Sequence, residues 1–405
     1  MGVALSSEAS GFARVRAGLQ LSRDLAARLD EAGIRYCHFK SNQHLEEGLL
    51  GITDLDVLVD RRAGTELARI LDELDFKRFS APPAGDYPGV EDHLGFDAPS
   101  GRLIHLHLHF RLIVGERHLK GYRLPWEDLV LSTSREDRAT GFRVSDPDVE
   151  CLLLLVKSAL KLGATERVLS WLGRGATGTN ETREFAWLME RVDRDRLMSL
   201  GATLLGERAQ PALRAILTHG LSPRRLLALR EQSRPVLDRY RRYPRVEATA
   251  RRWWRMAIRG LVSWARKRSN PPMTVSRTDP RGGVVVAFVG ADGSGKSTLT
   301  RRVVAWLGWK LDARAVYFGS GEGPSSLLRL PLRWMFRRAR AAHDKKGNAL
   351  PFRDSVPSTA KAIWALVLAF EKRRRLTQVW RARNRGQIVF CDRYPQHQIM
   401  GFTDG

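Results

Sequence analysis

The sequence has few cysteines, and their placement argues against two classes of protein. Three of the 405 residues are cysteine, namely Cys37, Cys151 and Cys391. An odd number of widely separated cysteines does not support a disulfide framework, and the spacing matches no zinc-binding pattern. Cysteines of this kind are typical of a reducing environment such as the cytoplasm.

Long apolar runs are also lacking. No segment near the start of the sequence has the composition of a secretory signal, and no apolar run is long enough to span a bilayer. The hydrophobic fraction of 43% is nevertheless ordinary for a globular protein, so buried cores can form. A length of 405 residues predicts two or three domains, which we expect to be cytoplasmic.

Acidic residues are scarce relative to basic ones. The net charge is +24, and residues 221–270 hold 15 basic and three acidic residues, which is half of that excess. Such a segment favours an anionic partner such as a phosphate group or an acidic lipid, and a solvated arginine-rich surface is the alternative. No motif typical of DNA or RNA binding is present, so a nucleic-acid partner is not expected.

Around Gly290 the sequence changes from a strand pattern to a helix pattern through a glycine-rich loop. The Val-rich run 284–289 is typical of a strand buried on both faces, and apolar residues recur at helical spacing from Leu299 onward. The loop fits the phosphate-binding pattern G-x-x-x-x-G-K-[ST] without a mismatch. The residues predicted to bind the nucleotide are Gly290, Gly293, Ser294, Gly295, Lys296, Ser297 and Thr298.

This loop predicts binding of ATP together with Mg²⁺. Glycines allow the backbone dihedrals at which successive amides point toward a phosphate, and the N-terminus of the following helix adds a favourable dipole. Lys296 is expected to contact the β- and γ-phosphates, and the hydroxyl of Ser297 is expected to bind Mg²⁺.

A second buried strand, residues 388–391, ends in Asp392, Arg393 and Tyr394. An acid at the tip of a strand beside a phosphate loop can hold Mg²⁺ or the phosphate acceptor. We therefore expect Asp392 to act in catalysis or, with Ser297, in the metal site.

The loop Gly-Ala-Asp-Gly-Ser-Gly-Lys-Ser-Thr and the later Asp-Arg-Tyr resemble the thymidylate kinase family of nucleoside monophosphate kinases. The resemblance covers about the last third of the chain. It implies that Asp292 meets the sugar hydroxyl of the acceptor and that Arg393 binds the acceptor phosphate. Lys296 and Asp392 would complete the catalytic set.

Two departures from that family affect the prediction. The second strand, residues 315–318, leads into Gly-Ser-Gly-Glu-Gly-Pro instead of the family's Thr-Arg-Glu-Pro-like stretch, so thymidylate itself is not expected as the acceptor. The sequence also stops at Gly405, before the family's lid and further strands. We therefore expect an incomplete parallel-sheet kinase domain in which strand 388–391 leaves apolar surface exposed.

Near the N-terminus, two acids are separated by one residue in a predicted strand. Asp54 and Asp56 alternate with aliphatic residues, so both carboxylates project from one face, where they are suited to Mg²⁺. Lys40-Ser41 follows an earlier predicted strand. This turn, together with Gly-Ile-Thr-Asp-Leu-Asp at 51–56, resembles the turn and the acidic motif of minimal nucleotidyltransferases.

That resemblance implies an α+β fold and a third carboxylate on a later strand. The candidate strand is 103–112, in which His105, His107 and His109 alternate and share one face. It carries no acid, and His107 stands at the expected position, which argues against two-metal nucleotidyl transfer. The histidines either bind a transition metal or form a polar sheet face.

Helical patterns fill the middle of the sequence, from residue 147 to residue 245. The segment 251–268 is a predicted amphipathic helix with arginines on one side and tryptophans on the other. It either contacts a membrane surface or a partner complex, or connects domains with its arginine side in water. The Pro-containing stretch 271–282 is a predicted linker.

The predicted fold is an α/β multidomain chain. Its parts are a nucleotidyltransferase-like domain at 1–145, a helical domain at 146–270 and a P-loop domain at 283–405, truncated at its C-terminus. The predicted function is an ATP-dependent kinase acting on a nucleoside monophosphate or a similar small phosphorylated acceptor. The alternatives are an ATP-binding regulator or scaffold without turnover, and a nucleotidyltransferase acting on a sugar or nucleic acid.

Overall fold

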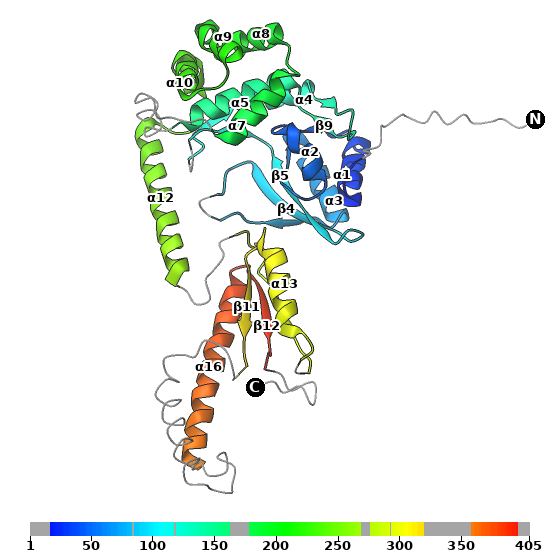
Figure 1. The fold of residues 1–405 in the computed structure, drawn as a ribbon, viewed down its shortest axis with the longest axis vertical. Coiled ribbons are helices and arrows are strands. Elements are labelled where there is room, and N and C mark those ends of the chain that lie inside the picture. Colours follow the sequence, from blue (N-terminus) through cyan, green and yellow to red (C-terminus); the bar gives the residue numbers. More distant parts are fainter. Residues whose placement is uncertain are drawn as a thin grey trace, which may run out of the picture. The chain divides into compact units, whose positions relative to one another are not determined.

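Two compact units make up the chain, Met1–Trp264 and Ala265–Gly405, and both mix helices with strands (Figure 1). The computed structural model describes residues 17–82, 85–116, 119–162, 178–268, 276–291, 293–319 and 358–395. The predicted acceptor-binding residue Asp292 lies outside the described residues.

A seven-stranded mixed sheet organises the first unit, with strand order β3-β4-β5-β2-β1-β9-β8. The central strand β2 pairs antiparallel with β1 and parallel with β5. The strands are β1 (Tyr36–His38), β2 (Leu55–Val59), β3 (Lys77–Phe79), β4 (Val90–Asp97), β5 (Arg102–His109), β8 (Arg135–Glu136) and β9 (Arg143–Val144).

The predicted strand 103–112 is in fact two strands. β5 ends at His109, and β6 (Leu112–Val114) pairs separately with β7 (Tyr122–Leu124). Apolar residues continue through the bend between them, so the sequence pattern conceals the break. The neighbour of β5 in the sheet, β4, is not predicted from the sequence.

Two hydrophobic cores lie on opposite faces of the large sheet. Val57 and Val59 of β2 pack in one core with residues of α1 and α3, whereas Leu58 packs with the helices that follow residue 146. Successive side chains of a strand point to opposite faces, so β2 contributes to both cores. The helices on the first side are α1 (Gln20–Glu31), α2 (Leu45–Leu49) and α3 (Gly64–Glu73).

The helices predicted in the middle of the chain pack on the second core. α5 (Pro147–Lys161) begins after Asp146, whose carboxylate accepts a hydrogen bond from the amide of Asp148, and it is buried on almost all sides. Cys37 and Leu58 of the sheet belong to the same core, so the predicted segments 1–145 and 146–270 share one compact unit. The other helices are α4 (Glu127–Ser132), α7 (Thr179–Met189), α8 (Arg194–Leu205), α9 (Gln210–His219), α10 (Pro223–Gln232) and α11 (Arg234–Leu237).

The predicted amphipathic helix is the last three quarters of α12 (Arg245–Arg268). On its arginine side, Arg252 forms an ion pair with Glu116 at 2.8 Å and Arg255 lies over the ring of Tyr87. The apolar residues Trp253, Trp254 and Leu261 are 60%, 67% and 65% exposed. Partners within the unit therefore hold Arg252 and Arg255 partly buried, whereas Arg251 and Arg259 are exposed. Both interpretations of this helix stay predictions.

None of the helices in the described part of the chain is both long and apolar enough to cross a lipid bilayer.

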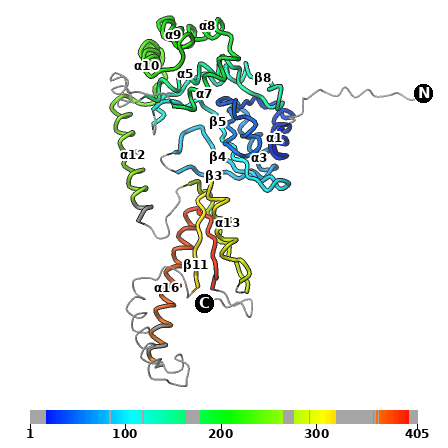
Figure 2. The backbone as a smooth tube through the Cα atoms, viewed as in Figure 1, coloured from blue at the N-terminus to red at the C-terminus, as the bar shows by residue number. Residues whose placement is uncertain are grey.

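The second unit is built on three parallel strands in the order β10-β12-β11. Figure 2 traces the backbone of this unit, with β11 and the helices α13 and α16 labelled. The phosphate-binding pattern lies between the first strand and the helix α13. The elements are β10 (Val285–Phe288), α13 (Lys296–Gly308), β11 (Ala313–Tyr317), α16 (Ser358–Asn384) and β12 (Ile388–Asp392).

The expectation that strand 388–391 leaves apolar surface exposed is wrong. β12 pairs on both edges, and Val389 and Cys391 are fully buried. Apolar residues are exposed on both sides of β10, where Val284 is 50% exposed and Val289 is 38% exposed.

Candidate functional site

The predicted phosphate loop of the second unit leads directly into α13. Gly295, the residue before the helix, has φ +83°, a left-handed conformation that glycine adopts without steric cost. The ammonium of Lys296 donates hydrogen bonds to the carbonyl oxygens of Gly290 at 2.6 Å and Ala291 at 2.7 Å. The predicted cation therefore lies over the loop, next to the N-terminus of a helix, where negative charge is favoured.

The two predicted Mg²⁺ ligands of this unit are in contact. Asp392 stands opposite Phe288 in the sheet register, at the carboxyl ends of β10 and β12. The hydroxyl of Ser297 donates a hydrogen bond to Oδ2 of Asp392. Within the described residues, the other carboxylate oxygen of Asp392 is buried without a hydrogen-bond partner. A buried, unsatisfied carboxylate oxygen beside a hydroxyl is a donor set that fits Mg²⁺.

Two arginines reach the same edge of the sheet. Arg393 follows β12 with φ +57°, an uncommon conformation for a residue with a side chain, and its guanidinium lies 5.9 Å from the ring centre of Tyr317. Arg375 of α16 donates a hydrogen bond to the carbonyl of Tyr317 at 2.6 Å. Tyr317 stands opposite Asp392 in the register, so Arg375 lies near the same carboxyl edge of the sheet as Asp392. Arg375 belongs to a run of three arginines at 373–375, which is the feature of the sequence that points to this residue.

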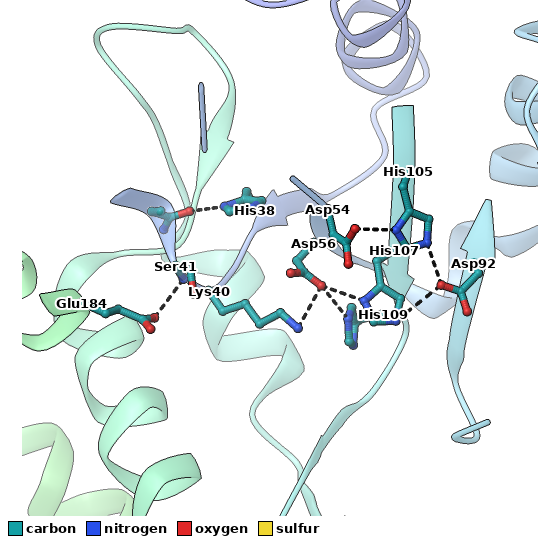
Figure 3. A network of polar contacts seen from close by, with 11 residues as sticks. His38, Lys40, Ser41, Asp54, Asp56, Asp92, His105, His107, His109 and Glu184 are labelled. Atoms are coloured by element: carbon teal, nitrogen blue, oxygen red, sulfur yellow. Dashed lines mark hydrogen bonds and ion pairs between the residues drawn. The ribbon is translucent and has the colours of Figure 1, made fainter. Parts of the chain in front are cut away.

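A second polar cluster lies in the first unit, around Asp56 (Figure 3). One carboxylate oxygen of Asp56 lies 2.8 Å from the ammonium of Lys40, 2.8 Å from Nδ1 of His107 and 3.3 Å from Nε2 of His109. Burial alone would raise the pKa of Asp56, but Lys40 and the two imidazoles outweigh it and hold the pKa well below its usual value. Burial, together with Lys40, lowers the pKa of His109 to about 3, so this imidazole is neutral.

Asp54 belongs to a neighbouring chain of hydrogen bonds, in which His105 links it to Asp92. Nδ1 of His105 lies 2.7 Å from Asp54, and Nε2 of the same ring lies 2.7 Å from Asp92. Asp92 is on β4, directly opposite His107 in the register. The third acid that strand 103–112 lacks is thus supplied by the adjacent strand, which the sequence analysis did not predict.

The turn after β1 is held by carboxylates from two helices. Ser41 has φ +54°, and its amide donates to Glu184 of α7 at 3.0 Å. The amide and the side-chain nitrogen of Asn42 donate to the two oxygens of Glu150 of α5, at 2.9 and 2.6 Å. The helical segment therefore fixes the backbone from which Lys40 projects.

A cavity of about 550 Å³ adjoins this cluster, a volume typical of small-ligand sites. Lys40 and His109 line it, and its basic residues are Lys40, Lys120, Lys157, Lys161 and Arg259. Burial, reinforced by the charge of Lys40, lowers the pKa of Lys120 to about 8 and lowers that of Lys157. The lining thus holds five basic residues against three acidic ones, Glu116, Glu150 and Glu184.

Glu150 should make stability depend on pH. Burial raises its pKa to about 7 from 4.5. Because folding raises this pKa, the contribution of Glu150 to the free energy of unfolding is fully present below pH 4.5 and is lost as the pH rises through 7. Between pH 5 and pH 8, the free energy of unfolding of the wild type should therefore fall by about 2 kcal/mol more than that of Glu150→Gln. Urea unfolding at pH 5 and pH 8 measures this difference in the free energy of unfolding. Glu190→Gln, at an exposed glutamate, is the control and should show the pH dependence of the wild type. Equal pH dependence of wild type and Glu150→Gln would contradict it.

Comparisons with known proteins give partial matches. No protein-family model matches the chain. The "Uncharacterized ATP-binding protein YghR" of Escherichia coli (strain K12) is 37% identical over 126 residues, which cover 29% of this chain and 47% of that protein. The "Uncharacterized ATP-binding protein YghS" of the same strain is 29% identical over 124 residues, covering 29% of this chain and 50% of that protein. The chain thus spans about half the length of these curated relatives.

Solved structures resemble the chain at low identity. The antibiotic-resistance factor ANT(2'')-Ia is 12% identical with a TM-score of 0.26, covering 49% of this chain and 94% of its own. An antigenic nucleotidyltransferase-like protein from Paracoccidioides brasiliensis is 13% identical with a TM-score of 0.27, covering 49% and 90% respectively. TM-scores this low do not define the fold of this chain.

Proposed function

We propose that the chain binds ATP with Mg²⁺ at residues 290–298 and transfers a phosphoryl group to a small phosphorylated acceptor, such as a nucleoside monophosphate. The observation that carries this proposal is the contact between Ser297 and Asp392 at the start of α13, with Lys296 over the loop. The ATP-binding names of the two relatives support it.

Catalysis in this proposal is positioning and charge neutralisation. Lys296 would bind the β- and γ-phosphates, and the loop amides would hold their oxygens. Ser297 and the unsatisfied oxygen of Asp392 would hold Mg²⁺. When bound, the ion neutralises charge on the transferring group.

The acceptor would lie at the carboxyl edge of the sheet, outside the strand ends. Arg393 and Arg375 both lie around Tyr317 at that edge, where guanidinium groups can bind an acceptor phosphate. Asp292 would meet the acceptor's sugar hydroxyl, as the resemblance to thymidylate kinases implies.

Nucleotidyl transfer at Asp54 and Asp56 is a second candidate, favoured by the nearby carboxylate of Asp92. Two observations weigh against it. The ammonium of Lys40 neutralises Asp56, and the amides of Ser41 and Asn42, which a triphosphate could use, donate to carboxylates instead. We therefore place the kinase first, with an ATP-binding regulator without turnover as its nearest rival.

A titration of the full chain with ATP, with and without Mg²⁺, tests the proposal, followed by transfer assays from γ-labelled ATP to a panel of monophosphates. We expect Mg²⁺-dependent binding and a labelled acceptor. Absence of ATP binding would refute the proposal, and binding without transfer to any acceptor would favour the regulator. Release of pyrophosphate from α-labelled ATP would favour nucleotidyl transfer.

Contact with a membrane surface or a partner complex through 251–268 stays a prediction. The exposed side of this helix is apolar, whereas Arg252 and Arg255 have partners within the unit. Any such contact would therefore be made by the tryptophans. Cytoplasmic location likewise stays a prediction.

A further inference from the structure

We infer that Asp56, His107 and His109 form a binding site for a divalent transition-metal ion in the first unit, and that this site opens onto the lysine-lined cavity. The inference goes beyond the proposed function, which concerns the second unit. A carboxylate oxygen of Asp56 and one ring nitrogen from each histidine all lie within 4.8 Å of one another. Ligand atoms this close can share one ion after small side-chain movements.

The backbone of two adjacent strands brings these three ligands together. Asp56 on β2 stands directly opposite His107 on the parallel strand β5. His109 follows two residues later and therefore projects from the same face as His107. The rings of the two histidines lie 4.5 Å apart between their centres. Because sheet register sets these positions, the ligands are held by rigid elements rather than by a loop.

The donor types select the class of metal. Two imidazole nitrogens and one carboxylate oxygen suit Zn²⁺, Fe²⁺ or Co²⁺, whereas Mg²⁺ prefers oxygen ligands. Three protein ligands also leave coordination positions for a substrate or water, as in catalytic metal sites. This ligand set differs from the Asp54–Asp56 pair that the sequence predicts for Mg²⁺.

One carboxylate, that of Asp92, lies behind the proposed ligand His107. Nδ1 of His107 faces Asp56, and its other nitrogen lies 4.0 Å from Asp92. Asp92 is in turn held by His105, whose ring is buried between Asp92 and Asp54. Carboxylates behind ligating histidines fix the ring orientation and raise the basicity of the ligand.

Lys40 connects this site to the cavity. Its ammonium is a cation 2.8 Å from the ligating oxygen of Asp56, so a metal ion would compete with it for the same carboxylate. Lys40 and His109 both line the cavity. A displaced Lys40 would join Lys120 and Lys157 there, next to the open side of the metal. This charge favours a small anionic ligand that carries a phosphate or carboxylate group.

Titration of the full chain with Co²⁺, followed by visible absorption, tests the inference, because Co²⁺ bound to nitrogen and oxygen ligands absorbs according to its geometry. We expect saturation at about one equivalent, displacement by Zn²⁺, and a spectral change on adding inorganic phosphate. His107→Ala and His109→Gln should each weaken Co²⁺ binding by at least about 100-fold, since loss of an outer-layer partner alone costs 10–100-fold.

Two further variants test whether Asp56 binds a metal ion or is only neutralised by Lys40. Lys40→Met should tighten Co²⁺ binding about tenfold, because the competing ammonium is gone. His44→Ala, at an exposed histidine outside the cluster, should bind like the wild type. The inference is overturned if folded His107→Ala or His109→Gln binds Co²⁺ as the wild type does. It is also overturned if equimolar Mg²⁺ displaces Co²⁺, because an all-oxygen site would then be responsible.

Discussion

Replacing Lys296 by alanine should weaken ATP binding by at least about 100-fold and leave the fold intact. In the proposed function the side chain would supply a charge-assisted contact to the phosphates, and each such hydrogen bond contributes about 1.5–3 kcal/mol. Calorimetric titration with ATP measures the loss, and circular dichroism verifies the fold. Lys296→Met, which keeps the aliphatic volume of this nearly buried residue, should behave in the same way.

The matched control for this experiment is Arg302→Ala. Arg302 is an exposed cation on the same helix, α13, and its removal changes the net charge by the same amount. We expect it to bind ATP like the wild type. Unchanged affinity in Lys296→Ala would mean that residues 290–298 do not form the phosphate site.

Asp392→Asn should abolish the effect of Mg²⁺ on ATP binding and reduce turnover at least about 100-fold, the scale of losing one preorganised electrostatic contact. Asparagine keeps the size of the side chain and a hydrogen-bond partner for Ser297, but it removes the charge that balances the metal. Titrations with ATP in Mg²⁺ and in EDTA should differ for the wild type and coincide for the variant.

Asp279→Asn is the control for this second experiment. The amide of Asp279 bonds to Gly386, which precedes β12, so this acid lies at the opposite end of the strand from Asp392. The Asp279→Asn variant should still bind ATP differently in Mg²⁺ and in EDTA. If Asp392→Asn also shows this difference, Asp392 is not a metal ligand.

The phosphate loop can be predicted from the sequence because every part of the motif is local. A glycine-rich loop between a strand and a helix is specified by neighbouring residues, and Asp392 follows from a second short apolar run. The alternation of His105, His107 and His109 likewise predicts one shared face, and all three rings do contact aspartates of adjacent strands.

The remaining site residues depend on contacts that no local pattern specifies. Asp92 approaches His105 because β4 folds back on β5 in one particular register, and β4 contains polar residues that obscure its alternation. Arg375 reaches Tyr317 only through the docking of a long helix. A helical wheel separates the two sides of α12, but the contacts of Arg252 with Glu116 and of Arg255 with Tyr87 decide which side faces inward.

At the turn of Ser41 and Asn42, carboxylates of the same chain occupy the amides that an external anion would need. Its amide donors are occupied by Glu184 and Glu150, which are separated from them by 143 and 108 residues in the sequence. An external anion can bind there only in the fraction of molecules whose carboxylates have left, so its apparent dissociation constant is the intrinsic value divided by that fraction. The affinity of this turn for phosphate is therefore set by the packing of α5 and α7 as much as by the turn itself.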